Sequence, residues 1–128
     1  MRRAYFDSSA LVKLSHVEPY SDALIDYLEQ EPVEASTSIV ADVEVRRALR
    51  RAGAASDEAM RGFYLIALED EIRTKAALLG SPVVRSLDAI HLATALAIAD
   101  DQLEFVTYDG RQADAARALG LKVVQPGC

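Results

Sequence analysis

Short apolar segments alternate along this chain with longer segments of helical periodicity, and this alternation limits the possible folds more than any other feature. Strands joined by helices form βαβ units, in which a mainly parallel sheet is covered on both faces. We therefore predict an α/β fold with a mainly parallel central sheet flanked by helices. A chain of 128 residues is close to the usual domain size, so we predict one domain over residues 1–128.

The expected elements follow from the periodicity of apolar residues. The predicted strands are Arg3–Phe6, Val33–Thr37, Leu103–Thr107 and Lys122–Val124. The predicted helices are Ser8–Ser15, Tyr20–Gln30, Ile39–Ala52, Asp57–Phe63, Asp70–Leu79, Ser86–Ala99 and Arg111–Leu119, with an unassigned link over Tyr64–Leu68. Four residues mark helix ends: Pro19 at the start of the second helix, Ser38 and Ser86 as N-caps, and Gly53 as a stop.

Composition narrows the class of protein. The only cysteine is Cys128, so no internal disulfide can form and a reducing cytoplasm is expected. We expect neither a secretory signal nor a membrane span, because Asp7 interrupts the first apolar run and the most apolar stretch is too short. The net charge of −6 argues against a basic nucleic-acid-binding face, but a cluster of acids that binds cations would account for part of that charge.

Two aspartates directly follow predicted strands. Asp7 follows the first strand, and Asp109 follows the strand that ends at Thr107. Ligands of open α/β sheets bind at the carboxyl ends of the strands, where these two acids can meet. The alternative is that each aspartate only caps a helix or shapes a turn, since aspartate favours such places.

Two further acids lie on helices with apolar surroundings. Glu44 has mostly apolar neighbours at helical spacing, so it lies on or beside a buried face, where it needs a partner or a metal. The alternative is an internal ion pair with Arg47. Asp88 lies in the first turn of a helix that is apolar almost all round and therefore buried. We interpret His91, one turn later, as a structural, hydrogen-bonded histidine.

The chemistry left to this chain is that of oxygen ligands. We find no credible nucleophile–base pair, no cysteine–histidine set with zinc spacing and no glycine-rich phosphate loop. Carboxylates favour Mg²⁺ or Mn²⁺. Just past Glu44 lies a basic strip that either contacts RNA phosphates or is a solvated face, and it consists of Arg46, Arg47, Arg50 and Arg51.

Four stretches of the chain resemble the PIN-domain nucleases, and most closely the VapC toxins of bacterial toxin–antitoxin pairs. They are Tyr5–Lys13 (YFDSSALVK), Ser38–Leu49 (SIVADVEVRRAL), Arg85–Leu96 (RSLDAIHLATAL) and Thr107–Gly120 (TYDGRQADAARALG). The resemblance implies a PIN-like fold over nearly the whole chain. It also implies a site for one or two Mg²⁺ or Mn²⁺ ions made by four acids and supported by two polar residues: Asp7, Glu44, Asp88 and Asp109, with Ser8 and Thr107.

The same resemblance implies a function. The family cleaves RNA, often tRNA or rRNA, and is commonly a homodimer silenced by a small VapB-like antitoxin that reaches into the acidic site. Hydrolysis of a phosphodiester by metal-activated water needs no protein nucleophile, which agrees with the residues present. An alternative from another class is a non-catalytic PIN-like module that binds RNA or a partner. A response regulator or a haloacid-dehalogenase-like phosphatase would need acids or a lysine that are absent at the required places, such as an acid at Ser9.

Overall fold

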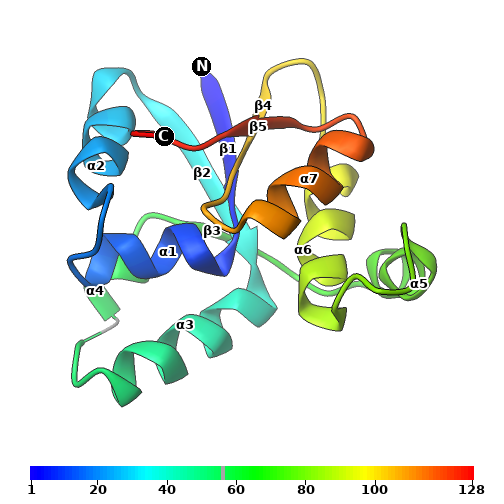
Figure 1. Ribbon diagram of the computed structural model, residues 1–128, viewed down its shortest axis with the longest axis horizontal. Coiled ribbons are helices and arrows are strands. Elements are labelled where there is room, and N and C mark those ends of the chain that lie inside the picture. The colour runs from blue at the N-terminus through cyan, green and yellow to red at the C-terminus, as the bar shows by residue number, and fades with distance from the viewer. Residues whose placement is uncertain (56) are drawn as a thin grey trace.

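The computed structural model describes residues 1–55 and 57–128 and contains a five-stranded parallel sheet with strand order β3-β2-β1-β4-β5 (Figure 1). The strands are β1 (Arg2–Phe6), β2 (Val33–Ser38), β3 (Tyr64–Ile66), β4 (Leu103–Val106) and β5 (Lys122–Val124). The helices are α1 (Ser8–Ser15), α2 (Ser21–Gln30), α3 (Ile39–Arg51), α4 (Asp57–Met60), α5 (Asp70–Leu78), α6 (Ser86–Ala97) and α7 (Gly110–Ala118). The predicted α/β class with a parallel sheet is confirmed.

The sheet is covered on both faces because successive side chains of a strand point to opposite sides. In β1, Phe6 enters a core cluster with residues of α1, α2 and α3, whereas Tyr5 enters a second cluster with residues of α6 and α7. The same alternation divides Val106 and Phe105 of β4 between the two clusters. The carboxyl-terminal halves of β1 and β4 therefore bury apolar side chains on both faces, as expected for a parallel sheet between two helical layers.

One strand was missed by the sequence analysis. Residues 64–66, predicted as part of an unassigned link, form β3 and pair with β2. β3 has only three residues, and its Tyr64 and Leu65 are exposed, so it shows no alternation that periodicity could detect. The helix predicted over residues 57–63 ends earlier, at Met60. Ser56 lies outside the described residues.

Helix boundaries follow the expected residues in two of four cases. Ser38 caps α3 by accepting a hydrogen bond from the amide of Val40 at 3.1 Å, and Gly53 follows α3 with a φ of 73°, which glycine adopts without strain. Pro19 does not start α2, which begins two residues later. Ser86 is the first residue of α6 rather than its N-cap. Among the described residues, no helix combines the length and apolarity needed to cross a membrane.

The pairing of β1 with β4 positions the site. Phe6 lies beside Val106 in the register, so the residues that follow the two strands, Asp7 and Thr107, are neighbours at the carboxyl edge of the sheet. The amide of Asp7 continues the ladder by donating to the carbonyl of Val106 at 3.1 Å. On the other side of β1, the hydroxyl of Thr37 donates to the carbonyl of Phe6 at 2.7 Å. The end of β1 is thus fixed from both neighbouring strands.

Candidate active site

Asp7 is both a helix cap and a buried carboxylate. Its Oδ1 accepts hydrogen bonds from the Ala10 amide at 3.1 Å and from the Ser9 hydroxyl at 2.6 Å, and its Oδ2 accepts a short one from the Thr107 hydroxyl. The residue is only 4% exposed. Burial raises the pKa of Asp7, and the hydrogen bonds from Ser9 and Thr107 oppose that rise. The capping interpretation is therefore correct, and it is compatible with a role in a site.

Glu44 of α3 reaches α1 and α6. Its Oε1 accepts a hydrogen bond from the Ser8 hydroxyl at 2.7 Å and lies 3.1 Å from His91 Nε2. Burial alone would raise the pKa of Glu44, but the hydrogen bonds from His91 and Ser8 outweigh burial and lower it. The described residues contain no ion pair between Glu44 and Arg47, so that alternative is wrong. Ser8, predicted as a supporting residue, lies directly against Glu44.

His91 is hydrogen-bonded, as predicted, and its partners include two residues of the proposed site, Ser8 and Glu44. It is buried, with Nδ1 2.7 Å from the Tyr5 hydroxyl and Nε2 3.0 Å from the Ser8 hydroxyl. The carboxylate of Glu44 beside Nε2 favours a proton there, which leaves Nδ1 to accept from Tyr5. Burial raises the pKa of Tyr5, which keeps its hydroxyl protonated as a donor. In the sequence, the one signal that His91 lies near the acids was its spacing, since it follows Asp88 by three residues on a buried helix.

Asp88 and Asp109 lie on α6 and at the start of α7. Burial raises the pKa of Asp88, and the negative charge of Asp109 raises it further. Asp109 caps α7 by accepting hydrogen bonds at Oδ1 from the amides of Arg111 at 2.9 Å and Gln112 at 3.2 Å. The side chain of Gln112 in turn donates to the carbonyl of Asp88 at 3.2 Å. Gln112 was not identified from the sequence, where a glutamine inside a short helix carries no signal.

Hydroxyl groups connect Asp7 to the segment that leads into α7. Thr107 Oγ1, predicted as a supporting group, accepts from the amide of Asp109 at 3.2 Å while it donates to Asp7. Ser9, which the sequence analysis did not select, donates to Asp7, and its Oγ accepts from the amide of Tyr108 at 2.9 Å. The edge of the sheet between β1 and β4 is therefore a continuous polar network.

The donor set suits a hard divalent cation. All four acids offer carboxylate oxygens, the ligands that Mg²⁺ and Mn²⁺ prefer. Within the described residues, the carboxylate of Asp88 and Oδ2 of Asp109 make no hydrogen bond, so both retain acceptor capacity. In the same part of the chain, however, no group of three or more His, Cys, Asp or Glu side chains already stands where it could hold a metal. The four acids therefore supply the kind of ligand that such an ion needs, but their described side chains do not form a ready-made metal site.

The basic strip divides into two parts. Arg46 donates to Asp42 at 2.8 Å, one helical turn away. Arg47, Arg50 and Arg51 line a shallow depression on the surface of α3. No described contact joins these three side chains to the acids.

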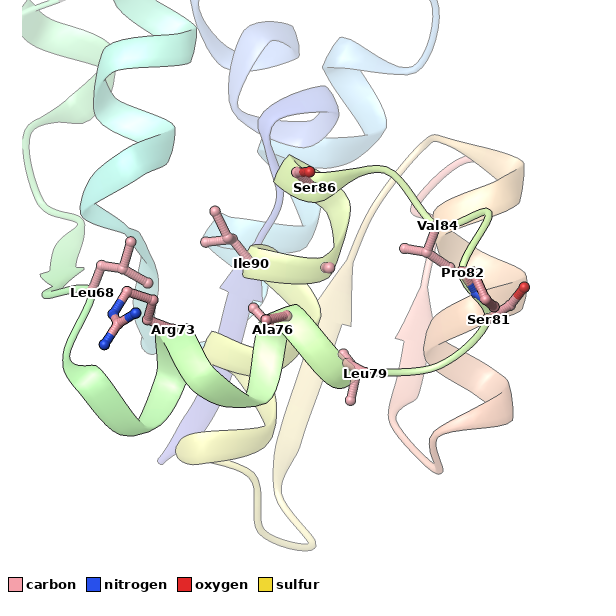
Figure 2. Close-up of a pocket in the computed structure, with 11 residues that line it drawn as sticks. Leu68, Arg73, Ala76, Leu79, Ser81, Pro82, Val84, Ser86 and Ile90 are labelled. Carbon is pink, nitrogen blue, oxygen red and sulfur yellow. The ribbon is translucent and has the colours of Figure 1, made fainter.

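A separate cavity of about 390 Å³ lies between α5 and α6, below the loop that carries Val84 (Figure 2). Its wall is largely apolar, with Leu68, Ala76 and Ile90 on view beside Arg73. Acidic side chains are absent from the described part of this wall, so this cavity offers no carboxylate ligands for a cation.

Comparison with known proteins identifies a family. The model of the PIN domain matches residues 4–118. The chain is 41% identical over 133 residues to ribonuclease VapC35 of Mycobacterium tuberculosis (strain ATCC 25618 / H37Rv), covering 96% of each chain. It is 40% identical over 130 residues to ribonuclease VapC46 of the same strain, covering 98% of this chain and 99% of the relative.

Solved structures agree on the fold. The chain superimposes on the sarcin-ricin loop cleaving toxin VapC20 of Mycobacterium tuberculosis with a TM-score of 0.73 at 14% identity, covering 96% of this chain and 99% of the other. A toxin–antitoxin complex from Klebsiella pneumoniae gives a TM-score of 0.68 at 24% identity, with 96% and 97% covered. These likenesses concern the arrangement of strands and helices.

Proposed function

We propose, because the chain belongs to the PIN-domain family and within it to the VapC ribonucleases, that this protein is a Mg²⁺- or Mn²⁺-dependent endoribonuclease and the toxin of a toxin–antitoxin pair. The observation that carries the proposal is the polar network at the ends of β1 and β4. There Thr107 joins Asp7 to Asp109, Gln112 joins Asp109 to Asp88, and Ser8 and His91 hold Glu44.

Asp7, Glu44, Asp88 and Asp109 are the residues that would hold the metal. A bound divalent cation supplies an activated water and neutralises charge on the phosphate and on the leaving oxygen. The protein contributes position and charge state. Hydroxyls of Ser9 and Thr107 fix both oxygens of Asp7.

Charge repulsion between the acids supports the same assignment. The pKa of Asp88 is raised by burial first and then by the charge of Asp109, and the nearby His91 and Arg85 do not offset this rise. A bound cation would relieve the repulsion between these acids. A module that only binds RNA or a partner would gain nothing from placing the acids so close together. Glu44 differs, since its lowered pKa keeps it ionised and ready as a ligand.

RNA is the proposed substrate, and a structured RNA such as tRNA or rRNA is the expected class. The net charge of −6 means that contact with phosphates depends on local cations rather than on the overall field. Arg47 and Arg50 lie on α3, the helix that also carries Glu44, and would contact the backbone of a bound RNA.

The proposed protein partners are a small VapB-like antitoxin and a second copy of this chain. An antitoxin that inserts a cationic side chain among the four acids would neutralise them and block the metal. Light scattering of the purified chain, alone and with the product of the neighbouring reading frame, tests both partners. A monomer in both conditions would contradict the assignment of these partners.

The test of the activity is cleavage of total RNA by purified protein in Mg²⁺, in Mn²⁺ and in EDTA. We expect cleavage with either ion and none in EDTA. Glu44→Gln should abolish cleavage because it removes the charge of a ligand while keeping its shape. Glu29→Gln, at an exposed position of α2, is the matched control and should cleave like the parent. Cleavage by metal-free protein would refute the metal mechanism, and no cleavage under any condition would favour the non-catalytic alternative.

A further inference from the structure

A second cavity, of about 360 Å³, lies directly beside the proposed metal site. Asp88 and Asp109 form one side of it, and Val84, Arg85, Gln112 and Ala115 are among its other residues. The volume falls within the range of roughly 300–1,000 Å³ that is usual for small-molecule sites. The loop that carries Val84 separates this cavity from the one between α5 and α6. Whatever occupies it would touch the same two acids that would hold the metal.

The side-chain oxygen of Gln112 is a buried polar atom for which the described residues supply no partner. Gln112 is 1% exposed, and its side-chain nitrogen donates to the carbonyl of Asp88. Its Oε1 is buried and makes no hydrogen bond with any described residue. Buried acceptors without a partner are rare, because burial removes the water that would otherwise satisfy them. Gln112 lines the cavity, so a small turn of its side chain would let this unpaired oxygen accept from a ligand that carries an N–H or O–H donor.

The remainder of the cavity has apolar and basic surface and one further acid, Asp114, which forms an ion pair with Arg117. Val84 and Ala115 are apolar and partly buried, which suits the face of a flat ring. Arg85 and Arg111 are exposed, and neither forms an ion pair within the part of the chain that the structure describes. Exposed arginines next to a hydrolytic site are suited to holding a phosphate. An apolar slot, a buried acceptor and two exposed arginines together match one nucleotide.

We infer that this cavity binds the base of the nucleotide next to the cleaved phosphodiester, and that Gln112 Oε1 accepts a hydrogen bond from an exocyclic amino group of that base. Adenine fits best, because a glutamine amide can pair with N6 and N7 of adenine at once. Arg85 and Arg111 would hold the phosphate on the outer side of this nucleotide. The inference rests on the proposed ribonuclease function, and it adds a sequence preference at one position.

The test is binding of short fluorescent oligoribonucleotides in EDTA, measured by anisotropy. Without metal the proposed cleavage is off, so base preference is measured independently of catalysis. Oligonucleotides that differ at one position, with adenosine, uridine or purine riboside, compare bases with and without the amino group. We expect the adenosine form to bind at least about fivefold more tightly than the other two, which is the lower end of discrimination by such a pair.

Two variants test whether the base preference comes from this cavity. Gln112→Met should bind all three oligonucleotides with equal affinity, and a thermal melt checks that it is folded. Arg111→Gln should weaken binding of all three alike while keeping the preference, and Arg73→Gln, an exposed arginine of the other cavity, is its matched control.

Equal affinity of the parent for adenosine and purine riboside would overturn the inference, and so would an unchanged preference in folded Gln112→Met. If Gln112→Met does not fold, the comparison of oligonucleotides on the parent still decides. Cleavage of the adenosine form in Mg²⁺ is then measured separately. A base preference without cleavage would refute the proposed function but support the base site. Cleavage without a base preference would support the proposed function but refute the base site.

Discussion

Replacing Asp7 with asparagine separates the two roles that the structure gives this residue. As the N-cap of α1, Asp7 accepts from the amide of Ala10, and an asparagine oxygen can accept the same bond at almost no cost. The side chain also accepts from Thr107, and the asparagine NH₂ in that place would need the threonine hydroxyl to turn and accept. Loss of that one hydrogen bond would cost about 0.5–1.5 kcal/mol.

The buried charge acts in the opposite direction. Burial raises the pKa of Asp7, so the ionised carboxylate destabilises the folded, metal-free protein at neutral pH. Asparagine removes this charge. We therefore expect the variant to melt at the same temperature as the parent in EDTA, or higher. The advantage of the variant should shrink as the pH falls through the folded-state pKa of Asp7, because the parent then takes up a proton there and loses the buried charge.

Added Mg²⁺ should reverse the order of the two melting temperatures, so that the parent melts above Asp7→Asn. A ligand at 100 times its dissociation constant stabilises the folded state by about 2.7 kcal/mol. For a chain of this length, 1 kcal/mol corresponds to about 3–6 °C, so the parent should gain roughly 10 °C and the variant much less. Thermal melts in EDTA and in Mg²⁺, with RNA cleavage measured alongside, make the comparison. Asp26→Asn, at an exposed position of α2, is the control and should behave like the parent. If Asp7→Asn cleaves RNA and gains as much from Mg²⁺ as the parent, Asp7 is only a cap.

Three further predictions concern the surroundings of the site. Ser9→Ala should lower the affinity for Mn²⁺ by about 10–100-fold in isothermal titration, as loss of a partner of a metal ligand does, and an unchanged affinity would mean that Ser9 merely shapes the turn. Arg47→Ala combined with Arg50→Ala should flatten the log–log salt dependence of RNA binding by about one to two units, and an unchanged slope would make the strip a solvated face. Phe105→Ala should reduce the free energy of unfolding by about 3–5 kcal/mol in urea titrations, because the ring is fully buried and stacks on Tyr5; a loss under 1 kcal/mol would contradict that packing.

The sequence alone determined the class of fold and the place of two acids. The α/β class follows from local periodicity, which each segment carries independently of the others. Once the sheet is parallel, residues that follow its strands must lie at one edge, so Asp7 and Asp109 were predictable from their positions after β1 and β4. Glu44 was predictable for a different reason, since a carboxylate among apolar neighbours on a helix needs a partner.

Tertiary structure decided which groups those acids meet. Glu44 is bound by His91 and Ser8, residues 47 and 36 positions away, and no local pattern distinguishes these partners from Arg47 on the same helix. Gln112 became notable only when α7 packed beside α6 and left its Oε1 buried without a partner. Strand β3 likewise exists because β2 offers it a pairing edge. Periodicity reports which face of an element is buried, whereas hydrogen-bond partners depend on distances that are set only after the elements have packed.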